Sequence, residues 1–284
     1  MGAPIADLHA TRQQARKQAV TARLAEELVR DVAVRLGEQG ISVMPLKGVL
    51  LQRWLYDDPS ERPITDVDML VAPGQLATAR GILVRAGYRE TGRSRIGPIE
   101  LSNPFQLALD LHPSLFHPAR YRFPTESLFD RSSTDESLFG VQVSLPDPLD
   151  TYAHANGKFG SDHQTAAALF KLEEIARIGN RLSASPSQIA AHLTYCGMRR
   201  VARYVLWLGH EATGDALSRA VLEALAPDPL GRAIAAVSRT ALGLLPPHSR
   251  TGAIFAHLLN DTLPRGLWSG LRSLRGTRFP IDAV

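Results

Sequence analysis

Two aspartates, Asp66 and Asp68, are separated by one residue in an apolar run that ends at Val71. The run has the composition of a β-strand, in which alternate side chains point to the same face. The two carboxylates would lie side by side, where they repel each other unless a cation or a proton is bound between them. Mg²⁺ suits such oxygen ligands, because it usually binds one or two carboxylates together with water and phosphates. The spacing therefore predicts a divalent-metal site, against the alternative of an exposed turn or edge pair.

Lys47 and Gly48 lie upstream, where an apolar stretch that ends at Leu46 meets a short helical pattern. Glycine allows the backbone to approach a phosphate closely, and a helix N-terminus attracts anions. The chain thus combines a predicted phosphate end and a predicted metal end in one strand–helix–strand unit. Arg62 stands on the polar, proline-bounded loop that leads to Asp66. We interpret it either as a contact to a carboxylate or a nucleotide phosphate, or as a solvated loop residue.

A third aspartate, Asp110, occupies a second strand pattern, in which Ala108, Asp110 and His112 share one face. An aspartate within an apolar strand requires a partner, because burying an unpaired charge is costly. We predict that this strand lies beside the strand of Asp66, so that Asp110 joins the acidic pair. A salt-bridged aspartate at a strand end is the alternative. His112 would orient Asp110, touch the substrate, or be a half-buried polar residue.

These motifs together resemble a known family. The segment 44–48, then Tyr56, then the segment 62–71 are similar to an uncharacterised nucleotidyltransferase family of the polymerase-β-like nucleotidyltransferase superfamily. That family has Leu-Lys-Gly, a helix with a tyrosine near its end, an arginine, and an Asp-apolar-Asp strand. Its third acidic residue falls in a stretch that the segment 110–112 matches. The superfamily more often has Gly-Ser in place of Lys47-Gly48, and the departure is typical of this branch.

The resemblance implies a fold, an activity and a cofactor. The implied fold is α+β, a polymerase-β-like core with a mixed sheet flanked by helices, followed by an α-helical bundle. The implied enzyme is a Mg²⁺-dependent nucleotidyltransferase, with Mn²⁺ as the alternative ion. It would move a nucleoside monophosphate from a triphosphate such as ATP to an acceptor by a two-metal mechanism. Asp66, Asp68 and Asp110 would be its catalytic residues and metal ligands.

Nucleotide contacts are expected from both halves of the chain. The backbone N–H of Gly48, together with Lys47 and Arg62, would hold the triphosphate. His154 and Lys158 are four positions apart in a helical pattern, so they share one helix face. They would reach phosphates from the helical half, or alternatively face solvent.

A composition shift at residues 146–148 predicts the domain boundary. We expect a catalytic domain over 1–145, with an N-terminal helix at 12–36, and a helical domain over 146–284. Strands are expected at 41–46, 66–71, 88–93, 98–102, 105–112 and, at an edge, 141–145. Shorter helices are expected at 49–56 and after Gly74, and irregular structure at 113–140. The second domain should contain helices at 149–158, 163–179, 186–197, 199–210, 212–226, 229–244, 250–263 and 265–275.

Composition sets broad limits on function. The 284 residues are 44% hydrophobic, which is ordinary for a globular protein, and a net charge of +4 is compatible with a phosphate-bearing substrate. Cys196 is the only cysteine, so an intramolecular disulfide is excluded and a cysteine-based zinc site is not expected. Cys196 is predicted to be a small core residue. The sequence shows neither a signal-peptide pattern nor a run of about 20 apolar residues, which predicts a cytoplasmic protein without a membrane partner.

Two other functional classes stay open. The protein could be a catalytically weak nucleotide-binding or regulatory protein, including a toxin–antitoxin component, although the intact set of three aspartates argues against this. The helical half could instead be an RNA- or protein-binding module, but the sequence has no basic run with interleaved aromatics. The acceptor stays open among small molecules, peptides or proteins, and RNA.

Overall fold

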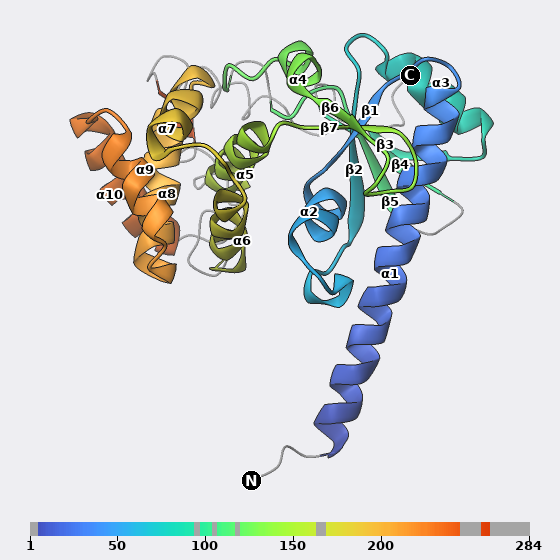
Figure 1. Cartoon of the computed structure of the whole chain (residues 1–284), viewed down its shortest axis with the longest axis horizontal. Helices are drawn as coiled ribbons and strands as arrows, with labels where there is room; N and C mark the ends of the chain where they lie inside the picture. The colour runs from blue at the N-terminus through green and yellow to red at the C-terminus, as the bar shows by residue number, and fades with distance from the viewer. Residues whose placement is uncertain are drawn as a thin grey trace. The chain divides into compact units, whose positions relative to one another are not determined.

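The structure is a computed structural model that describes residues 5–93, 97–103, 107–116, 120–162, 169–244 and 257–261. The chain divides into two compact units (Figure 1). Among the described residues, the first unit comprises those up to Leu115 together with Thr125–Pro146, and the second comprises Phe116–Pro124 and those from Asp147 onward. The assignment of a catalytic domain to 1–145 and a helical domain to 146–284 stays a prediction.

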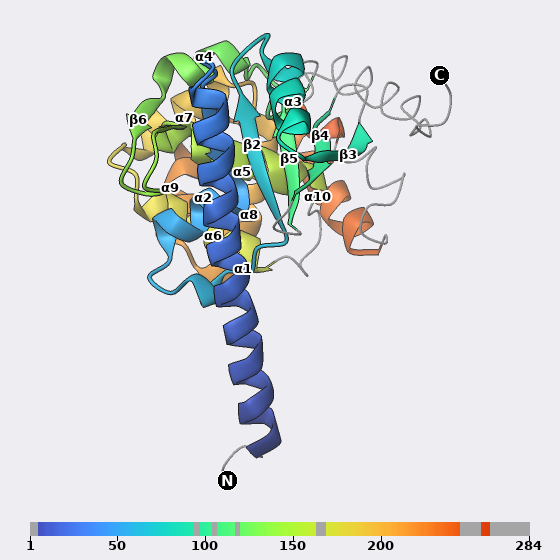
Figure 2. The same ribbon diagram turned by 90° about the vertical axis from the view of Figure 1, so that its right-hand side faces the viewer.

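The first unit is built on a five-stranded sheet with the strand order β1-β2-β5-β4-β3. Figure 2 labels β2, β5, β4 and β3 of this sheet. The central strands β2 and β5 are parallel, whereas the other neighbouring pairs are antiparallel. The sheet is therefore mixed, and the expected α+β architecture is confirmed. The strands are β1 (Val43–Leu46), β2 (Asp66–Val71), β3 (Arg89–Arg93), β4 (Ile99–Ser102) and β5 (Ala108–His112).

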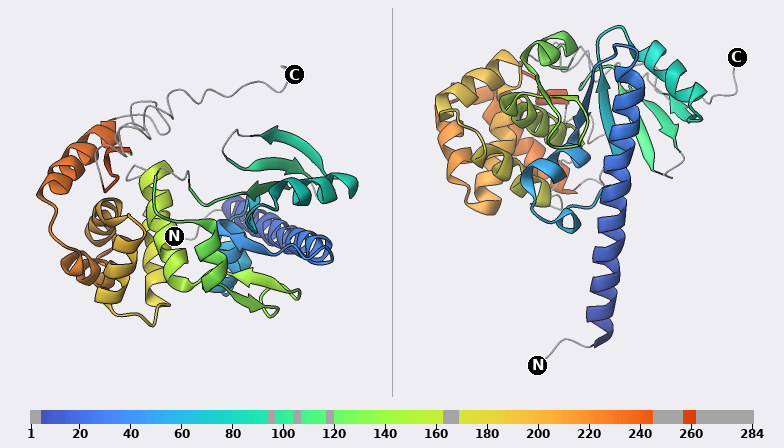
Figure 3. Two further views of the ribbon diagram at one scale, coloured as in Figure 1. Left: turned by 90° about the horizontal axis from the view of Figure 1, so that it is seen from above. Right: turned by 45° about the vertical axis from the view of Figure 1, so that its right-hand side comes forward.

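Three helices contribute buried side chains to the core on this sheet: α1 (Ile5–Gly37), α2 (Lys47–Leu55) and α3 (Leu76–Arg85). The first unit also contains the 3₁₀ helix η1 (Pro59–Glu61) and α4 (Thr125–Arg131). In α1, Leu28, Val32 and Leu36 recur at helical spacing and are fully buried in one core cluster with Val67 and Met69 of β2. Since Asp66 and Asp68 alternate with these two strand residues, the carboxylates point away from that cluster. The first turns of α1 extend beyond the sheet (Figure 3).

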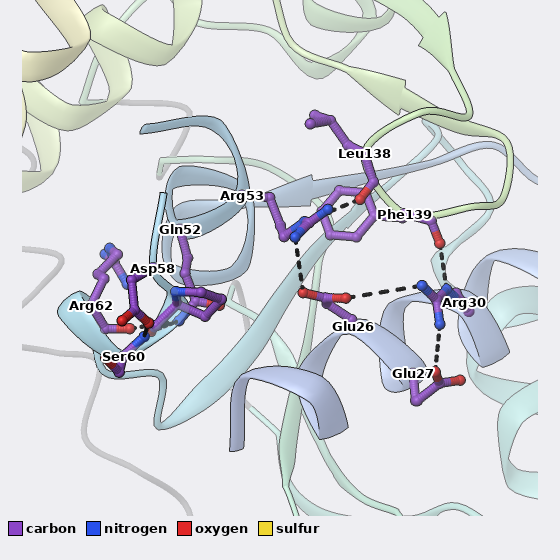
Figure 4. A network of polar contacts seen from close by, with 11 residues as sticks. Glu26, Glu27, Arg30, Gln52, Arg53, Asp58, Ser60, Arg62, Leu138 and Phe139 are labelled. Carbon is purple, nitrogen blue, oxygen red and sulfur yellow. Dashed lines mark hydrogen bonds and ion pairs between the residues drawn. The ribbon is translucent and has the colours of Figure 1, made fainter. Parts of the chain in front are cut away.

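A polar network ties α1 to α2 and to the loop before β7 (Figure 4). Glu26 of α1 forms ion pairs with Arg53 of α2, at 3.5 Å, and with Arg30, at 3.9 Å. Arg53 Nε donates to the carbonyl of Leu138, and Arg30 Nε donates to the carbonyl of Phe139. These contacts fix the helix that begins at the predicted phosphate end of the site.

The region predicted to be irregular contains regular structure, so that expectation is wrong for α4 and for β6 (Ser133–Asp135). The edge strand expected at 141–145 exists as β7 (Val143–Leu145), but it pairs with β6 in a separate two-stranded sheet (Figure 3). A helix of 7 residues and a strand of 3 residues are too short to produce a clear period in the sequence.

The described part of the second unit is helical. Its helices are α5 (Pro148–Asp162), α6 (Leu169–Asn180), α7 (Pro186–Tyr195), α8 (Arg199–Thr213), α9 (Ala216–Ala224) and α10 (Pro229–Leu244). Ser185 and Gln188 form a capping box at the start of α7. α5 and α8 approach closely, because a Cβ on Gly160 would lie only 2.1 Å from Cγ2 of Val201.

The remaining predicted helices fall mostly outside the described residues. This holds for the segment 163–168, for 265–275, and for 250–263 except 257–261. Within the part of the chain that the structure describes, no helix is both long and apolar enough to span a bilayer.

Candidate active site

The strands β2 and β5 bring two of the three predicted aspartates together. In the parallel register Asp68 pairs with Asp110, Asp66 with Ala108, and Leu70 with His112. Register partners on neighbouring strands share a face of the sheet, so the Asp68 and Asp110 side chains project side by side. The prediction that the two aspartate strands are neighbours is confirmed.

Asp68 is the buried centre of this group, with 3% of its surface exposed. Its Oδ1 accepts a hydrogen bond from Lys47 Nζ at 2.5 Å and lies 2.7 Å from His112 Nε2. Burial alone would raise the pKa of Asp68, but the His112 hydrogen bond and the Lys47 charge hold that pKa well below its usual range. Asp68 is therefore an anion at neutral pH.

Asp110 lies in the opposite electrostatic situation. Burial, followed by the negative charges of Asp68 and Asp66, raises the pKa of Asp110 to about 6, with Lys47 opposing the shift and Glu100 adding to it. Glu100 belongs to β4 and is the antiparallel register partner of Asp110. The acidic face is thus crowded with like charges, which a bound cation would neutralise.

Potential ligand atoms of Asp68, Asp110 and His112 all lie within 4.8 Å of one another. Two hard carboxylate oxygens fit Mg²⁺ or Mn²⁺. A bound cation would also reduce the repulsion between the negative charges around Asp110. The residues present therefore fit the divalent ion that was predicted from the sequence.

Asp66 lies on the same sheet face but does not join Asp68 and Asp110 in such a compact group among the described residues. Its Oδ1 accepts a hydrogen bond from Thr65 Oγ1 at 2.9 Å.

Two other residues of the acidic face, His112 and Glu100, have contacts that the sequence did not predict. His112 contacts Asp68, and Glu100 lies beside Asp110 on β4. Strand alternation placed His112 on the acidic face, but its contact with Asp68 and the position of Glu100 depend on strand pairing.

Lys47 has an unusual backbone as well as an unusual contact. Among the described non-glycine residues, only Lys47 has a positive φ, of 46°. Such left-handed conformations are strained for residues with a side chain and cluster at functional sites. Its ammonium group lies at the metal end of the site, on Asp68, so its predicted contact with phosphates stays a prediction.

Gly48 and Arg62 are neighbours in space. A Cβ on Gly48 would lie 3.0 Å from Nη1 of Arg62, so the glycine leaves room for the guanidinium. Arg62 is 9% exposed, which excludes the interpretation as a solvated loop residue. Gln52 Nε2 fixes its backbone by donating to the carbonyls of Arg62, at 2.7 Å, and Pro59, at 2.8 Å (Figure 4). A positive group is therefore held over the first turn of α2.

Comparison with known proteins now assigns the family. Residues 3–214 match the family described as "Uncharacterised nucleotidyltransferase". The chain belongs to this family. The match extends from α1 through α8, so the nucleotidyltransferase family assignment includes the first helices of the second unit as well as the sheet.

Two solved structures show weaker similarity to the chain. One is the crystal structure of an antigenic nucleotidyltransferase-like protein from Paracoccidioides brasiliensis, with 15% identity and a TM-score of 0.44, covering 72% of this chain and 95% of that one. The other is the structure of tRNA-processing enzyme complex 3, with 12% identity and a TM-score of 0.25, covering 88% of this chain and 93% of that one. No curated protein matches the chain.

The remaining two predicted nucleotide contacts of this family member lie on α5. His154 is buried, and the ring of Phe116 meets it edge-on with centroids 5.4 Å apart. Lys158, one helical turn later, is half-buried. Burial excludes the alternative of a solvent-facing His154. The contact of either residue with a phosphate stays a prediction.

Proposed function

We propose that this protein is a Mg²⁺-dependent nucleotidyltransferase that moves a nucleoside monophosphate from a nucleoside triphosphate onto a hydroxyl of an acceptor. The observation that carries the proposal is the register of β2 and β5, which pairs Asp68 with Asp110 on one sheet face. Family membership supports the reaction class, and the buried, charge-crowded carboxylates support the metal requirement.

Asp66, Asp68 and Asp110 would hold the ions, which are Mg²⁺ or alternatively Mn²⁺. When bound, a pair of such ions stabilises the attacking and leaving oxygens of an in-line displacement. His112 orients Asp68, because its Nε2 lies 2.7 Å from the same oxygen that Lys47 contacts. The fixed carboxylates require no reorganisation during the reaction, which is the basis of electrostatic catalysis.

The transfer forms one bond and breaks one bond. The acceptor oxygen bonds to the α-phosphorus, the bond from that phosphorus to the α–β bridging oxygen breaks, and pyrophosphate leaves. The hydroxyl proton passes to Asp110, which we propose as the acceptor-side carboxylate. Lys47, Arg62 and the backbone N–H of Gly48 would hold the charge of the triphosphate oxygens.

The second unit would contribute further phosphate contacts through His154 and Lys158. The acceptor is a small molecule, a peptide or protein, or an RNA that carries the attacking hydroxyl. A cytoplasmic location would supply the nucleotide, for which ATP is the first candidate, together with Mg²⁺.

The test is label transfer from two positions of the nucleotide. The full chain is incubated with Mg²⁺, a cell extract and ATP labelled at either the α- or the γ-phosphate, and fractions are examined for a labelled acceptor. We expect labelling from the α-phosphate alone, lost with Asp68→Asn and kept with Asp130→Asn, which removes an exposed charge on α4. Labelling from the γ-phosphate would instead indicate a kinase. Triphosphate binding without α-label transfer under these conditions would favour the nucleotide-binding regulatory protein.

A further inference from the structure

Three chemically different side chains converge within the second unit. Asp150 lies in the first turn of α5, His192 in the last turn of α7, and Cys196 directly after α7. His192 and Cys196 are four residues apart, so they share the face of α7 that meets α5. Asp150 and Cys196 each have 0% of their surface exposed. A carboxylate, an imidazole and a thiol are therefore gathered in a water-poor environment.

Asp150 and Cys196 both contact the same atom, Nε2 of His192. His192 Nε2 lies 2.9 Å from Asp150 Oδ1 and 3.6 Å from Cys196 Sγ. The potential ligand atoms of the three residues all lie within 4.8 Å of one another. The oxygen, nitrogen and sulfur atoms thus surround a common point.

This geometry does not fit a nucleophilic cysteine triad. In such a triad the carboxylate contacts one ring nitrogen of the histidine and the thiol contacts the other. Here both contacts fall on Nε2, which carries either a proton or a lone pair. With a proton, Nε2 donates to Asp150 but cannot accept from the thiol. With a lone pair, it accepts from the thiol but faces the carboxylate without a proton.

We propose that Asp150, His192 and Cys196 form a Zn²⁺ site that links α5 to α7. A single ion resolves the conflict at Nε2, because it accepts electron pairs from all three atoms at once. For a tetrahedral ion with Zn–S of about 2.3 Å and Zn–N and Zn–O of about 2.1 Å, the S···N separation is about 3.6 Å and the N···O separation about 3.4 Å. The observed S···N separation of 3.6 Å matches this geometry, and the observed N···O separation of 2.9 Å would widen by about 0.5 Å on ion binding.

The donor set distinguishes this site from the acidic site of the first unit. Thiolate and imidazole ligands favour Zn²⁺ over Mg²⁺, which prefers oxygen. Three protein ligands leave one coordination position for a water molecule or a small ligand. Because the ligands come from two helices, ion binding would stabilise the folded second unit. The inference is independent of the proposed nucleotidyl transfer.

Cobalt spectroscopy tests the site, because Co²⁺ substitutes for Zn²⁺ and absorbs in the near ultraviolet when bound to a thiolate. Cys196 is the only cysteine in the chain, so this absorption has a single possible source. The untagged full chain, stripped with a chelator and carrying Asp68→Asn to weaken the acidic site, is titrated with CoCl₂. We expect the thiolate band to saturate at one equivalent and to disappear when Zn²⁺ is added.

Variants then assign the ligands. Adding Cys196→Ala should abolish the band and reduce the bound Zn²⁺ from one equivalent to none, and His192→Gln should do the same. Zn²⁺ should raise the melting temperature of the Asp68→Asn protein but not of the Cys196→Ala double variant. If a ligand variant fails to fold, the CoCl₂ titration of the Asp68→Asn protein still shows whether the bound ion has a thiolate ligand. Saturation with Co²⁺ without a thiolate band, or an unchanged Zn²⁺ stoichiometry in folded Cys196→Ala, would overturn the proposal.

Discussion

The ammonium nitrogen of Lys47 lies 2.5 Å from Oδ1 of Asp68, although the two residues are 21 positions apart in the sequence. Lys47 reaches this position with a left-handed backbone, at a φ of 46°. The side chain of Asp68 is 4% exposed and that of Lys47 is 26% exposed, so the pair is shielded from solvent on the carboxylate side. The backbone of Lys47 therefore belongs to the predicted phosphate end of the site, and its ammonium group reaches the predicted metal end.

Lys47→Ala tests whether this ammonium also contacts the nucleotide. We expect triphosphate affinity to fall about tenfold or more, because a hydrogen bond to a charged group contributes about 1.5–3 kcal/mol. Binding of a fluorescent triphosphate analogue measures the change, with Lys17→Ala on the exposed face of α1 as the control. If Lys47→Ala binds the triphosphate as tightly as the wild type, Lys47 serves Asp68 alone. The phosphate end must then be sought at Arg62 or Lys158.

Asparagine at Asp68 and at Asp110 should have opposite effects on stability in the absence of metal. Asp68→Asn should lower the free energy of unfolding by about 1–3 kcal/mol, because Lys47 and His112 lose a charged partner. Asp110→Asn should maintain or raise it, because the Asp110 carboxylate faces the like charges of Asp68 and Asp66. Chemical denaturation in a chelating buffer measures both changes. Equal destabilisation by the two variants would show that Asp110 also has a structural partner.

The same two variants separate the chemical roles of the aspartates. Both should reduce nucleotidyl transfer by about 10²–10³-fold or more, the scale for losing one electrostatic partner of a transition state. Asp110→Asn should affect the single-turnover rate far more than triphosphate affinity, because its proposed role is on the acceptor side. A loss of triphosphate affinity in Asp110→Asn as large as the loss of rate would contradict that role.

Gly48→Ala should displace Arg62 without unfolding the protein. The new Cβ would lie 3.0 Å from Nη1 of Arg62, which is closer than ordinary contact, so the guanidinium must shift. We expect triphosphate affinity to fall about tenfold, which corresponds to about 1.4 kcal/mol. Gly37→Ala is the matched control, because an added Cβ there meets no atom within 4 Å.

A double variant identifies the cause of that loss. If Gly48→Ala acts by moving the guanidinium, it should cause little further loss in an Arg62→Ala background. Additive losses would mean that Gly48 contacts the phosphate through its own backbone. Isothermal titration with a non-hydrolysable triphosphate distinguishes the two outcomes.

Asp31 gives a pH-dependent contribution to stability that lies outside the site. Its Oδ2 accepts hydrogen bonds from Arg35 Nε at 2.8 Å and Tyr88 Oη at 2.7 Å. Burial opposes ionisation, but these bonds hold the pKa of Asp31 below its usual range. The folded state therefore gains stability above the unfolded pKa, near 3.9, and loses it as the pH falls through the folded pKa.

Asp31→Asn should consequently cost on the order of 1 kcal/mol of unfolding free energy at pH 7. The difference from the wild type should shrink as the pH is lowered below about 4. Urea unfolding across this range measures the effect, with Asp130→Asn as the exposed control. A difference that stays constant with pH would show that packing, and not charge, is responsible.

Local periodicity was sufficient to place several key side chains. Alternation along β2 puts Asp66 and Asp68 on the face opposite Val67 and Met69, and alternation along β5 puts Asp110 and His112 together. The helical spacing of Leu28, Val32 and Leu36 marks the buried face of α1. These features depend on residues close in sequence, so they can be read from sequence without knowledge of the fold. The same dependence on periodicity explains why α4 and β6 were not predicted: neither element is long enough to show a period.

Only the tertiary structure decided how these faces meet. The pairing of Asp68 with Asp110, the place of Glu100 beside them and the return of Lys47 to Asp68 all depend on strand order and register. The meeting of Asp150 with His192 depends on how α5 packs against α7. Such contacts join residues far apart in the chain, where the sequence pattern carries no distance information. A shift of one residue in the register of β5 would turn Asp110 toward the opposite face, because side chains alternate along a strand. The sequence alone therefore determined which residues are candidates for the chemistry, and the packing of the sheet and helices determined which of these candidates lie together.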